Sequence, residues 1–266
     1  MKSIDFIKKT LNFSKKINSC FIKKFYVFDE LSSTNIKAKE LSQDGEAEGT
    51  VVIAQMQKSG RGRFDRRWES PDGGLYLSII LKPDVSPDKI TLLPLVAALA
   101  VSTTISNYGL SSTIKWPNDI RVHKKKISGI LLESDVNENQ LHHVILGIGV
   151  NLNIDVNFFP SELKDITTSL LHELHTAVNY HKFLENLLLS FDTYYAMFLN
   201  EEFESIISKW KKQSDTIDRR VKIITSSDEV IGKAYDVDRS GFLLVITASG
   251  EHKKIMSGDC LYFSEL

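Results

Sequence analysis

The chain has 266 residues, of which 42% are hydrophobic and 25% charged, and its formal net charge is −1. This ordinary globular composition suits one large domain and a small one, and it excludes a global basic field that would draw the protein onto nucleic acid. Two distant cysteines, Cys20 and Cys260, argue against a disulfide framework and favour a reducing cytoplasm, and no apolar run reaches the ~18 residues of a membrane span.

The first 24 residues are basic, with apolar residues interleaved. They hold seven lysines and one acidic residue. They lack the continuous apolar core of a signal peptide and the arginines of a transit peptide. We expect a short amphipathic helix in this segment that packs on the following domain.

Short apolar runs bounded by turn residues predict strands, and longer amphipathic segments predict helices. In the first half of the chain we expect strands at 24–31, 50–57 and 75–82, and helices at 32–45 and about 88–108. The hydroxyl and amide residues at the start of 32–45 are suited to cap that helix. The next segment predicts β-hairpins: a strand at 113–116 with a turn at Pro117-Asn118-Asp119, a hairpin turning around Lys124 and Lys125, and a second turning at Asn137-Glu138-Asn139 into a strand at 141–153.

The remaining chain predicts a loop at 155–169, helices at 180–199 and 201–213, and four or five short strands from Arg220 onward. Short strands separated by SSD, RSG and SG turns are typical of a small SH3-like β-barrel. Hairpins combined with a few long helices predict an α+β fold, with a mixed sheet flanked by helices. We therefore expect an N-terminal extension (1–24), a ligand-binding domain (25–215) and a C-terminal barrel (216–266).

An arginine-rich loop, QKSGRGRFDRRW at residues 57–68, joins two of the expected core strands. Arginine forks bind carboxylate or phosphate with paired hydrogen bonds, and glycines let a backbone approach a ligand closely. The loop matches neither the phosphate-binding loop nor the dinucleotide fingerprint. A solvated charged loop and a nucleic-acid grip remain alternatives, although Phe64 and Trp68 are the only aromatic platforms at hand. The residues with ligand-binding chemistry are Gly60, Arg61, Gly62, Arg63 and Arg66.

Three further strings lie at the ends or in the interiors of expected strands. KWPND (115–119) puts an amide and a carboxylate on a tight turn, where both are also ordinary turn formers. KKISGILLE (125–133) puts Lys126 at a strand start and a glycine in its interior, and GIGVN (147–151) has two glycines on one strand face. Interior glycines weaken a strand and often mark a close approach to its backbone. Together these strings predict a ligand groove along one side of the sheet.

The same strings resemble the signature motifs of biotin protein ligases, in the family's order. They are GRGRFDRRW (60–68), KWPND (115–119), KISGILLE (126–133) and GIGVN (147–151), and SSTN (32–35) and AQMQ (54–57) match as well. The resemblance covers roughly residues 25–262. Without an N-terminal winged helix, the chain resembles the monofunctional type that lacks a DNA-binding domain.

The resemblance implies a class II synthetase-like catalytic domain and an enzyme that uses ATP and Mg²⁺ to activate biotin as biotinyl-5′-AMP. It further implies transfer of the biotinyl group to a lysine of a biotin carboxyl carrier domain, in the cytoplasm. No nucleic-acid or membrane partner is implied, and a homodimer remains open.

Carried onto this sequence, the resemblance assigns roles residue by residue. The implied catalytic residues are Lys126, Arg63, Arg66 and Asp119. The implied biotin-binding residues are Ser33, Thr34, Asn35, Gln57, Gly60, Arg61, Lys126, Gly129 and Gly147. The implied ATP-binding residues are Arg61, Arg63, Arg66, Trp68, Asn118 and Asn151.

One departure and two alternative functions accompany this assignment. Many members of the family have an arginine near the C-terminus that reaches the nucleotide, whereas the corresponding stretch here, GDCLYF, ends in Phe263, so no site residue is assigned to the small domain and its contact with the nucleotide is left open. Ser33 and Thr34 could serve only as helix caps. The paired histidines at 142–143 and 172–175 lack the partners of a metal site. A lipoate or octanoate transferase and a non-catalytic ligand- or nucleic-acid-binding regulator are the other functions.

Overall fold

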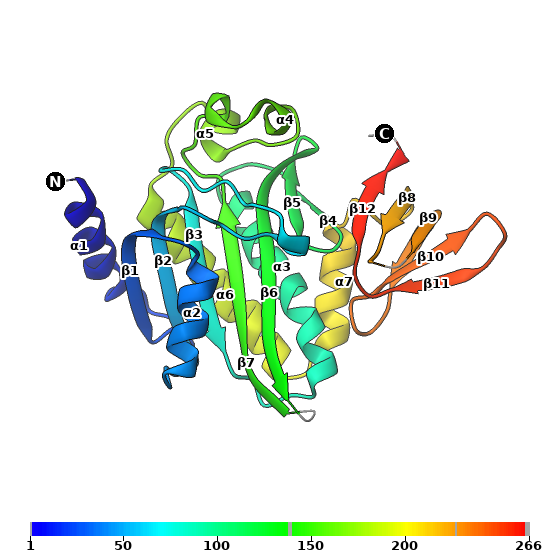
Figure 1. Ribbon diagram of the computed structural model, residues 1–266, viewed down its shortest axis with the longest axis horizontal. Coiled ribbons are helices and arrows are strands. Elements are labelled where there is room, and N and C mark those ends of the chain that lie inside the picture. The colour runs from blue at the N-terminus through cyan, green and yellow to red at the C-terminus, as the bar shows by residue number, and fades with distance from the viewer. Residues whose placement is uncertain (1, 138–139, 227, 264–266) are drawn as a thin grey trace.

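The computed structural model describes residues 2–137, 140–226 and 228–263, and its main body is a seven-stranded mixed sheet (Figure 1). The strand order is β1-β2-β3-β7-β6-β5-β4, in which β1 and β2 are parallel and the other neighbours antiparallel. This confirms the expected α+β class with a mixed sheet. The strands are β1 (Lys24–Leu31), β2 (Thr50–Gln57), β3 (Leu75–Leu81), β4 (Thr113–Lys115), β5 (Asp119–Val122), β6 (Lys125–Asn137) and β7 (Gln140–Val150).

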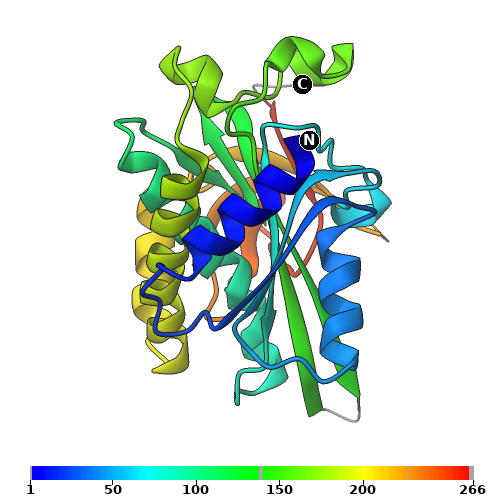
Figure 2. The same ribbon diagram turned by 90° about the vertical axis from the view of Figure 1, so that its left-hand side faces the viewer.

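Helices cover both faces of this sheet, with α2 on one face and α3 and α6 on the other (Figure 2). The α-helices are α1 (Lys2–Ser14), α2 (Thr34–Gln43), α3 (Leu93–Ser106), α4 (Ser161–Lys164), α5 (Leu170–Leu174), α6 (Tyr180–Leu199) and α7 (Phe203–Gln213), and the 3-10 turns are η1 (Arg63–Asp65), η2 (Pro87–Leu92) and η3 (Val156–Phe158). Helix α3 is apolar around most of its circumference because it lies between the sheet and α6, which buries nearly every side.

One stretch in the described part of the chain, Pro87–Ser106, is long and apolar enough to cross a membrane by length and composition. Of its most apolar window, 72% is buried inside the fold, as a core helix would be.

The N-terminal extension forms α1, which confirms the amphipathic helix expected there. Its apolar residues pack against the main core, and Phe6 meets the ring of Tyr180 edge-on at 5.5 Å. Thr10 and Phe13 both contact His181 at the start of α6. The extension is therefore part of the folded domain.

Two sequence expectations differ from the structure in detail. Residues 155–169, expected to be a loop, contain η3 and α4. The β5–β6 hairpin turns at His123 and Lys124, one residue earlier than expected, because these two residues take the positive φ angles (48° and 67°) that the turn requires. Of the turn expected at Asn137-Glu138-Asn139, the last two residues lie outside the described part of the chain.

The C-terminal region forms a five-stranded antiparallel sheet in the order β11-β10-β9-β8-β12. The expected barrel is wrong: the ladders of the described strands leave β11 and β12 as the two edges of an open sheet. The strands are β8 (Arg220–Ile224), β9 (Glu229–Val237), β10 (Leu243–Thr247), β11 (His252–Ile255) and β12 (Asp259–Tyr262).

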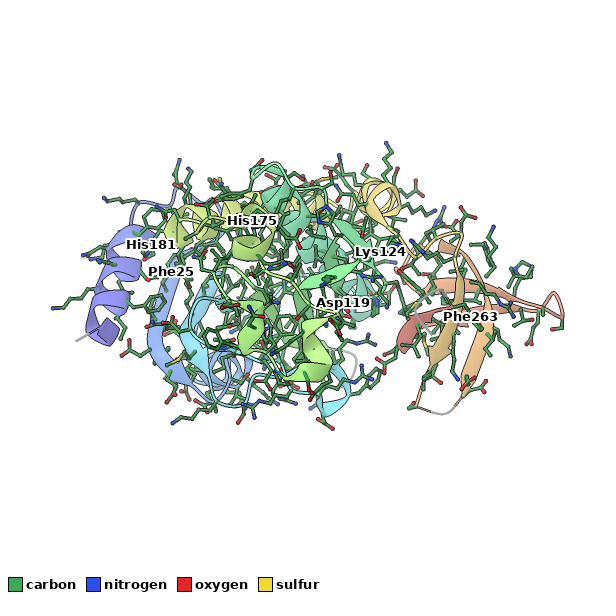
Figure 3. All side chains as sticks on the ribbon, turned by 90° about the horizontal axis from the view of Figure 1, so that it is seen from above. Phe25, Asp119, Lys124, His175, His181 and Phe263 are labelled. Carbon is green, nitrogen blue, oxygen red and sulfur yellow. The ribbon has the colours of Figure 1, made fainter. Side chains whose placement is uncertain are left out.

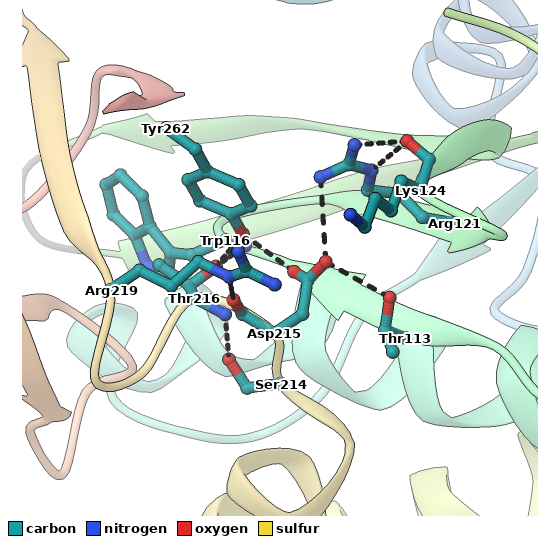
Figure 4. Close-up of polar contacts among 9 residues, drawn as sticks. All are labelled: Thr113, Trp116, Arg121, Lys124, Ser214, Asp215, Thr216, Arg219 and Tyr262. Atoms are coloured by element: carbon teal, nitrogen blue, oxygen red, sulfur yellow. Dashed lines mark hydrogen bonds and ion pairs between the residues drawn. The ribbon is translucent and has the colours of Figure 1, made fainter. Parts of the chain in front are cut away.

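A buried polar cluster joins this small sheet to the main body (Figure 4). Asp215, in the segment after α7, lies 3.5 Å from the guanidinium of Arg121 on β5 and accepts a 2.6 Å hydrogen bond from the Tyr262 hydroxyl on β12. Burial raises the pKa of Tyr262, and Asp215 raises it further, so the phenol stays neutral and donates. Trp116 completes the junction, with its indole donating to the carbonyl of Gly241 at 3.1 Å.

Candidate active site

A cavity of about 330 Å³ lies above the β3-β7-β6-β5 part of the sheet. It is enclosed by the arginine loop (57–68), by the segment 156–167 that carries α4, and by Asp259 of the small sheet. Viewed from above, Asp119 lies in the half of the molecule nearer the small sheet, far from His181 and α1 (Figure 3). Every site residue named from the sequence lines this cavity except Gly60: Ser33, Thr34, Asn35, Gln57, Arg61, Arg63, Arg66, Trp68, Asn118, Asp119, Lys126, Gly129, Gly147 and Asn151.

Neutral hydrogen-bonding groups from α2 and β2 form one end of the cavity. The backbone N–H and the hydroxyl of Thr34 both donate to Gln57 Oε1, at 2.8 and 3.1 Å, and Gln57 Nε2 donates to Ser70 at 2.9 Å. Ser33 occupies the N-cap position of α2 but makes no side-chain capping bond, and it is only 2% exposed. Helix capping therefore does not account for Ser33.

Asn35 connects this end to a carboxylate. Its amide donates to Glu133 at 2.7 Å and its carbonyl accepts from the buried hydroxyl of Ser78 at 2.6 Å. A Cβ on Gly147 would lie only 2.2 Å from Asn35 Oδ1. The space left by the missing side chain of Gly147 is therefore filled by Asn35, and Asn35 is the side chain that would contact a ligand there.

The glycines of β6 and β7 clear a slot in which Trp68 lies. A Cβ on Gly149 would approach the indole nitrogen to 2.5 Å, and one on Gly129 would approach ring atom Cζ3 to 3.0 Å. The Lys126 ammonium stands 5.2 Å from the ring centroid. Gly60 does not line the cavity but joins the two ends of the arginine loop, since its carbonyl accepts a 2.9 Å hydrogen bond from the backbone N–H of Trp68. A Cβ on Gly60 would lie only 2.3 Å from the Trp68 carbonyl oxygen, so this close contact requires glycine.

Three cations of the site are paired with carboxylates from three different places in the chain. Lys126 lies 2.7 Å from Asp119, across the β5–β6 pair. Arg61 lies 2.8 Å from Glu133, and Arg66 pairs with Asp259. The cations are between 31% and 65% exposed. Pairs this exposed contribute about 1 kcal/mol or less, so anionic substrate groups can replace the carboxylates.

Arg63 is the most enclosed arginine of the loop. Its guanidinium donates to the Gly258 carbonyl at 3.2 Å and to the Ser257 hydroxyl at 2.9 Å, both in the turn before β12. Burial lowers the pKa of Arg63, and the nearby carboxylates of Asp259 and Asp119 oppose that shift. A guanidinium remains charged even so, and a partly desolvated cation interacts strongly with a phosphate.

Two asparagines, one just before β5 and one just after β7, also line the cavity. Asn118 is tied to β6 by a 2.5 Å hydrogen bond from its amide to the Ile130 carbonyl. Asn151, 2% exposed, donates to the Thr168 carbonyl at 2.9 Å, while its Oδ1 is buried with no hydrogen-bond partner in the described structure. A buried acceptor without a donor destabilises the protein, so this oxygen is suited to a donor on a ligand.

Sequence analysis missed several residues of the site. Glu133 ends the KISGILLE string and was visible there, whereas Ser78 gave no signal in a solid apolar run. Asp259 is separated from Arg66 by 193 residues, and its place in the cavity adds a residue of the small domain to a site to which the sequence had assigned none. Phe263 lies outside the lining, against Arg220. Apolar lining also comes from Phe159, Leu163 and Ile166.

Metal-ligating side chains are not gathered here. Within the described residues, no group of three or more histidine, cysteine or acidic side chains could hold a metal ion. The carboxylates of the cavity are instead engaged by arginine and lysine.

Comparison with protein families gives two matches along the chain. Residues 27–151 match the biotin/lipoate A/B protein ligase family, and residues 216–261 match the biotin protein ligase C-terminal domain.

Similar proteins carry related names. The chain is 40% identical over 233 residues to the bifunctional ligase/repressor BirA of Bacillus subtilis, covering 87% of this chain and 71% of that protein. It is 29% identical over 231 residues to the biotin–acetyl-CoA-carboxylase ligase of Paracoccus denitrificans, covering 82% and 92%. Among solved structures, the biotin protein ligase from Aquifex aeolicus in complex with biotin and ATP superposes with a TM-score of 0.78 at 29% identity, covering 90% of this chain and 98% of that one.

Proposed function

This chain belongs to the biotin protein ligase family, and we infer that it joins biotin to a protein lysine in a reaction that uses ATP. The observation that carries this inference is the division of the cavity into two chemically different halves. Neutral amide and hydroxyl groups gather around Gln57 and Asn35, and cations gather around Arg63 and Lys126. The first half suits an uncharged ureido group, and the second suits a carboxylate beside a phosphate.

In the first step, a carboxylate oxygen of biotin attacks the α-phosphorus of ATP, pyrophosphate leaves, and biotinyl-5′-AMP remains. The two reacting groups are anions that repel each other, and negative charge grows on the phosphate oxygens in the transition state. We propose that Lys126, Arg63 and Arg66 stabilise this charge. To reach the phosphate, Lys126 would break its ion pair with Asp119, and Arg66 would break its pair with Asp259. Arg61 would exchange Glu133 for the biotin carboxylate or for ATP.

In the second step, the acceptor lysine amine attacks the biotinyl carbonyl carbon, AMP leaves with the electrons of the broken bond, and the amine loses a proton. We propose that Asp119 holds Lys126 in place before substrates bind, and receives that proton once Lys126 has turned to the phosphate. The acceptor we propose is the biotin carboxyl carrier domain of a carboxylase, in the cytoplasm. The chain has only two cysteines, which are distant in sequence, and this scarcity supports a reducing compartment.

For biotin, we propose contacts from Ser33, Thr34, Asn35 and Gln57, whose buried polar atoms match a group that both donates and accepts hydrogen bonds. For the nucleotide, we propose Trp68, Asn118 and Asn151, supported by the orphan Oδ1 of Asn151. Mg²⁺ would enter with ATP, be held by phosphate oxygens and water, and neutralise phosphate charge. The carboxylates of the site are paired with arginine or lysine, so they are not arranged to coordinate the metal ion themselves.

The test is incubation of the purified protein with labelled ATP and either biotin or lipoate. An adenylate formed with biotin alone is expected, because a site built to hydrogen-bond a ureido group leaves its own polar atoms unpaired when it holds an analogue without that group. Gln57→Ala is expected to reduce the difference between adenylate formation with biotin and with lipoate, mainly by weakening the use of biotin. Equal use of lipoate by the unaltered protein would overturn the choice of biotin.

A further inference from the structure

The most exposed large apolar side chains of the described structure are gathered around the cavity. Large apolar side chains usually lie in the core, and a cluster of them at the surface marks an interaction site. Four exceed all others in exposure, and each belongs to a segment that also lines the cavity: Phe158 (81% exposed), Met256 (69%), Ile166 (58%) and Phe64 (49%). We call these four residues the apolar rim.

One side of the apolar rim belongs to the segment that carries α4. Phe158 points outward although its neighbour Phe159 is buried in the cavity lining. Ile166 both lines the cavity and is exposed, and its carbonyl accepts from the backbone N–H of Lys126 at 2.8 Å. This side of the rim therefore stands directly beside Lys126.

The other side of the apolar rim belongs to the contact between the arginine loop and the small sheet. The Arg63 guanidinium lies 4.8 Å from the ring centroid of Phe64 and donates to the hydroxyl of Ser257 at 2.9 Å. Met256 immediately precedes Ser257. Phe64 thus lies against the arginine that faces the phosphate in the proposed reaction, and Met256 adjoins the residue to which that arginine donates.

We propose that the apolar rim is the docking surface for the carrier domain that presents the acceptor lysine. The inference rests on the proposed function, because only a transfer reaction requires a second protein at this mouth. A lysine side chain spans only a few ångströms, so the residues on either side of the acceptor lysine must lie on the rim when its amine reaches the activated carboxyl. The occupant we propose is therefore the carrier domain, with apolar side chains near its acceptor lysine that match the rim.

The position of the rim favours this occupant over the small substrates. Biotin and ATP would be held inside the cavity, where the proposed contacts are polar side chains. Phe158 and Met256 are outside the lining. Residues that act only on a protein substrate are expected to affect the second step and leave the first unchanged.

The experiment compares Phe158→Ser, Met256→Ser and the double variant with the unaltered protein in three assays. Pyrophosphate release with biotin and ATP reports adenylate formation, and transfer to hydroxylamine reports the reactivity of the adenylate towards a small nucleophile. Biotinylation of an unbiotinylated biotin carboxyl carrier domain of an acetyl-CoA carboxylase reports docking. Leu199→Ser, at the end of α6 and 43% exposed, is the matched control outside the rim.

We expect each rim variant to lower kcat/KM for the carrier domain about tenfold, chiefly through KM, with the first two assays unchanged. In the double variant, the fold reduction of kcat/KM for the carrier domain should be about the product of the two single reductions. Leu199→Ser should leave this kcat/KM unchanged. Unchanged carrier kinetics in the double variant would overturn the proposal, as would an equal loss of pyrophosphate release. A shift from dimer to monomer with unchanged carrier kinetics would assign the rim to a second copy instead. If the unaltered protein forms no adenylate, the proposed function itself fails.

Discussion

At the scale of single residues, Lys126 is the side chain whose loss should change the chemistry most. It stands between Asp119, 2.7 Å away, and the ring of Trp68. A fixed ammonium at the point where charge develops contributes more to the transition state than to the ground state. Lys126→Ala is therefore expected to slow adenylate formation about 10²–10³-fold while weakening biotin binding less.

Single-turnover rates of pyrophosphate release, together with a biotin titration, measure the two effects separately. Lys125→Ala is the control, since the preceding residue on the same strand points to the opposite face of the sheet. Unchanged adenylate formation in Lys126→Ala would remove this lysine from the catalytic group.

At the scale of elements, the arginine loop combines charged contacts with a single large apolar anchor. Its arginines hold it to Glu133 and Asp259 through exposed ion pairs, and Trp68 fixes one end in the glycine slot. Such pairs stabilise little, so we expect residues 58–67 to open frequently in the free protein. Biotin and ATP should hold the loop closed over the adenylate, excluding water from the anhydride.

Limited trypsin digestion tests this expectation, because trypsin cuts after arginine and lysine. Cleavage within 58–67 should be fast in the free protein and slow with biotin plus ATP. Asp259→Asn should speed cleavage of the free protein up to about fivefold, whereas Glu251→Gln, which removes another surface pair of the small sheet, should not. Equal rates of cleavage with and without both ligands would contradict this opening and closing, and would mean that the loop has the same conformation in both states.

The second element with a testable property is α1. His181 at the start of α6 lies 3.3 Å from the Thr10 hydroxyl and 5.1 Å from the ring of Phe13. Burial lowers the pKa of His181 below its ordinary value of 6.5, and Lys9 lowers it further. The folded protein therefore binds this proton less readily than the unfolded chain, so stability is full above about pH 6.5 and falls as the pH drops through the lowered pKa.

We expect the docking of α1 to loosen as the pH falls below about 6.5, seen as faster proteolysis of residues 1–20 and a lower unfolding temperature. His181→Gln should reduce this pH dependence. The exposed His175, which stands apart from α1 (Figure 3), is the matched site, and His175→Asn should preserve the dependence. A pH profile that is the same in His181→Gln as in the unaltered protein would contradict this account.

At the scale of the whole molecule, the junction in Figure 4 determines how the small sheet is held beside the cavity. The side chains of Arg121 and Asp215 are 8% and 10% exposed, and Asp215 also accepts from Tyr262. Removing one charge of a buried pair destabilises a protein by about 3–5 kcal/mol, because the attraction between the two desolvated charges is lost. Since Asp259 and Ser257 contact the arginine loop, loosening this junction should also disturb nucleotide use.

Asp215→Asn is accordingly expected to lower the free energy of unfolding by about 3 kcal/mol and to raise KM for ATP. Tyr262→Phe should lower it by only about 1 kcal/mol. Asp218→Asn is the control, since its side chain is 78% exposed in a surface pair with Lys233, and it should change stability by less than about 0.5 kcal/mol. Denaturant titration and ATP kinetics together check these values, and an effect of Asp215→Asn no larger than that of Asp218→Asn would contradict the role of the junction.

The sequence by itself determined most elements of the main sheet, because their signals are local. Short apolar runs predicted β1, β2, β3 and β7 within a few residues at their ends, and glycines or prolines marked many of the turns. The residues that line the cavity were also predictable from local sequence, because the motifs place glycines and polar side chains at fixed positions in strands or at their ends. The resemblance then gave the chemistry of biotin activation, which the family comparison supports.

Only the tertiary structure decided what depends on distant segments meeting. Glu133 reaches Asn35 across 98 residues of chain and also pairs with Arg61, and Asp259 reaches Arg66 across 193 residues. Whether five short strands close into a barrel or stay open depends on long-range pairing, which short apolar runs do not encode. Hydrophobic periodicity specifies which face of an element is buried, but the partner that buries it, and the side chains that the two elements bring together, are decided by the packing of the whole chain.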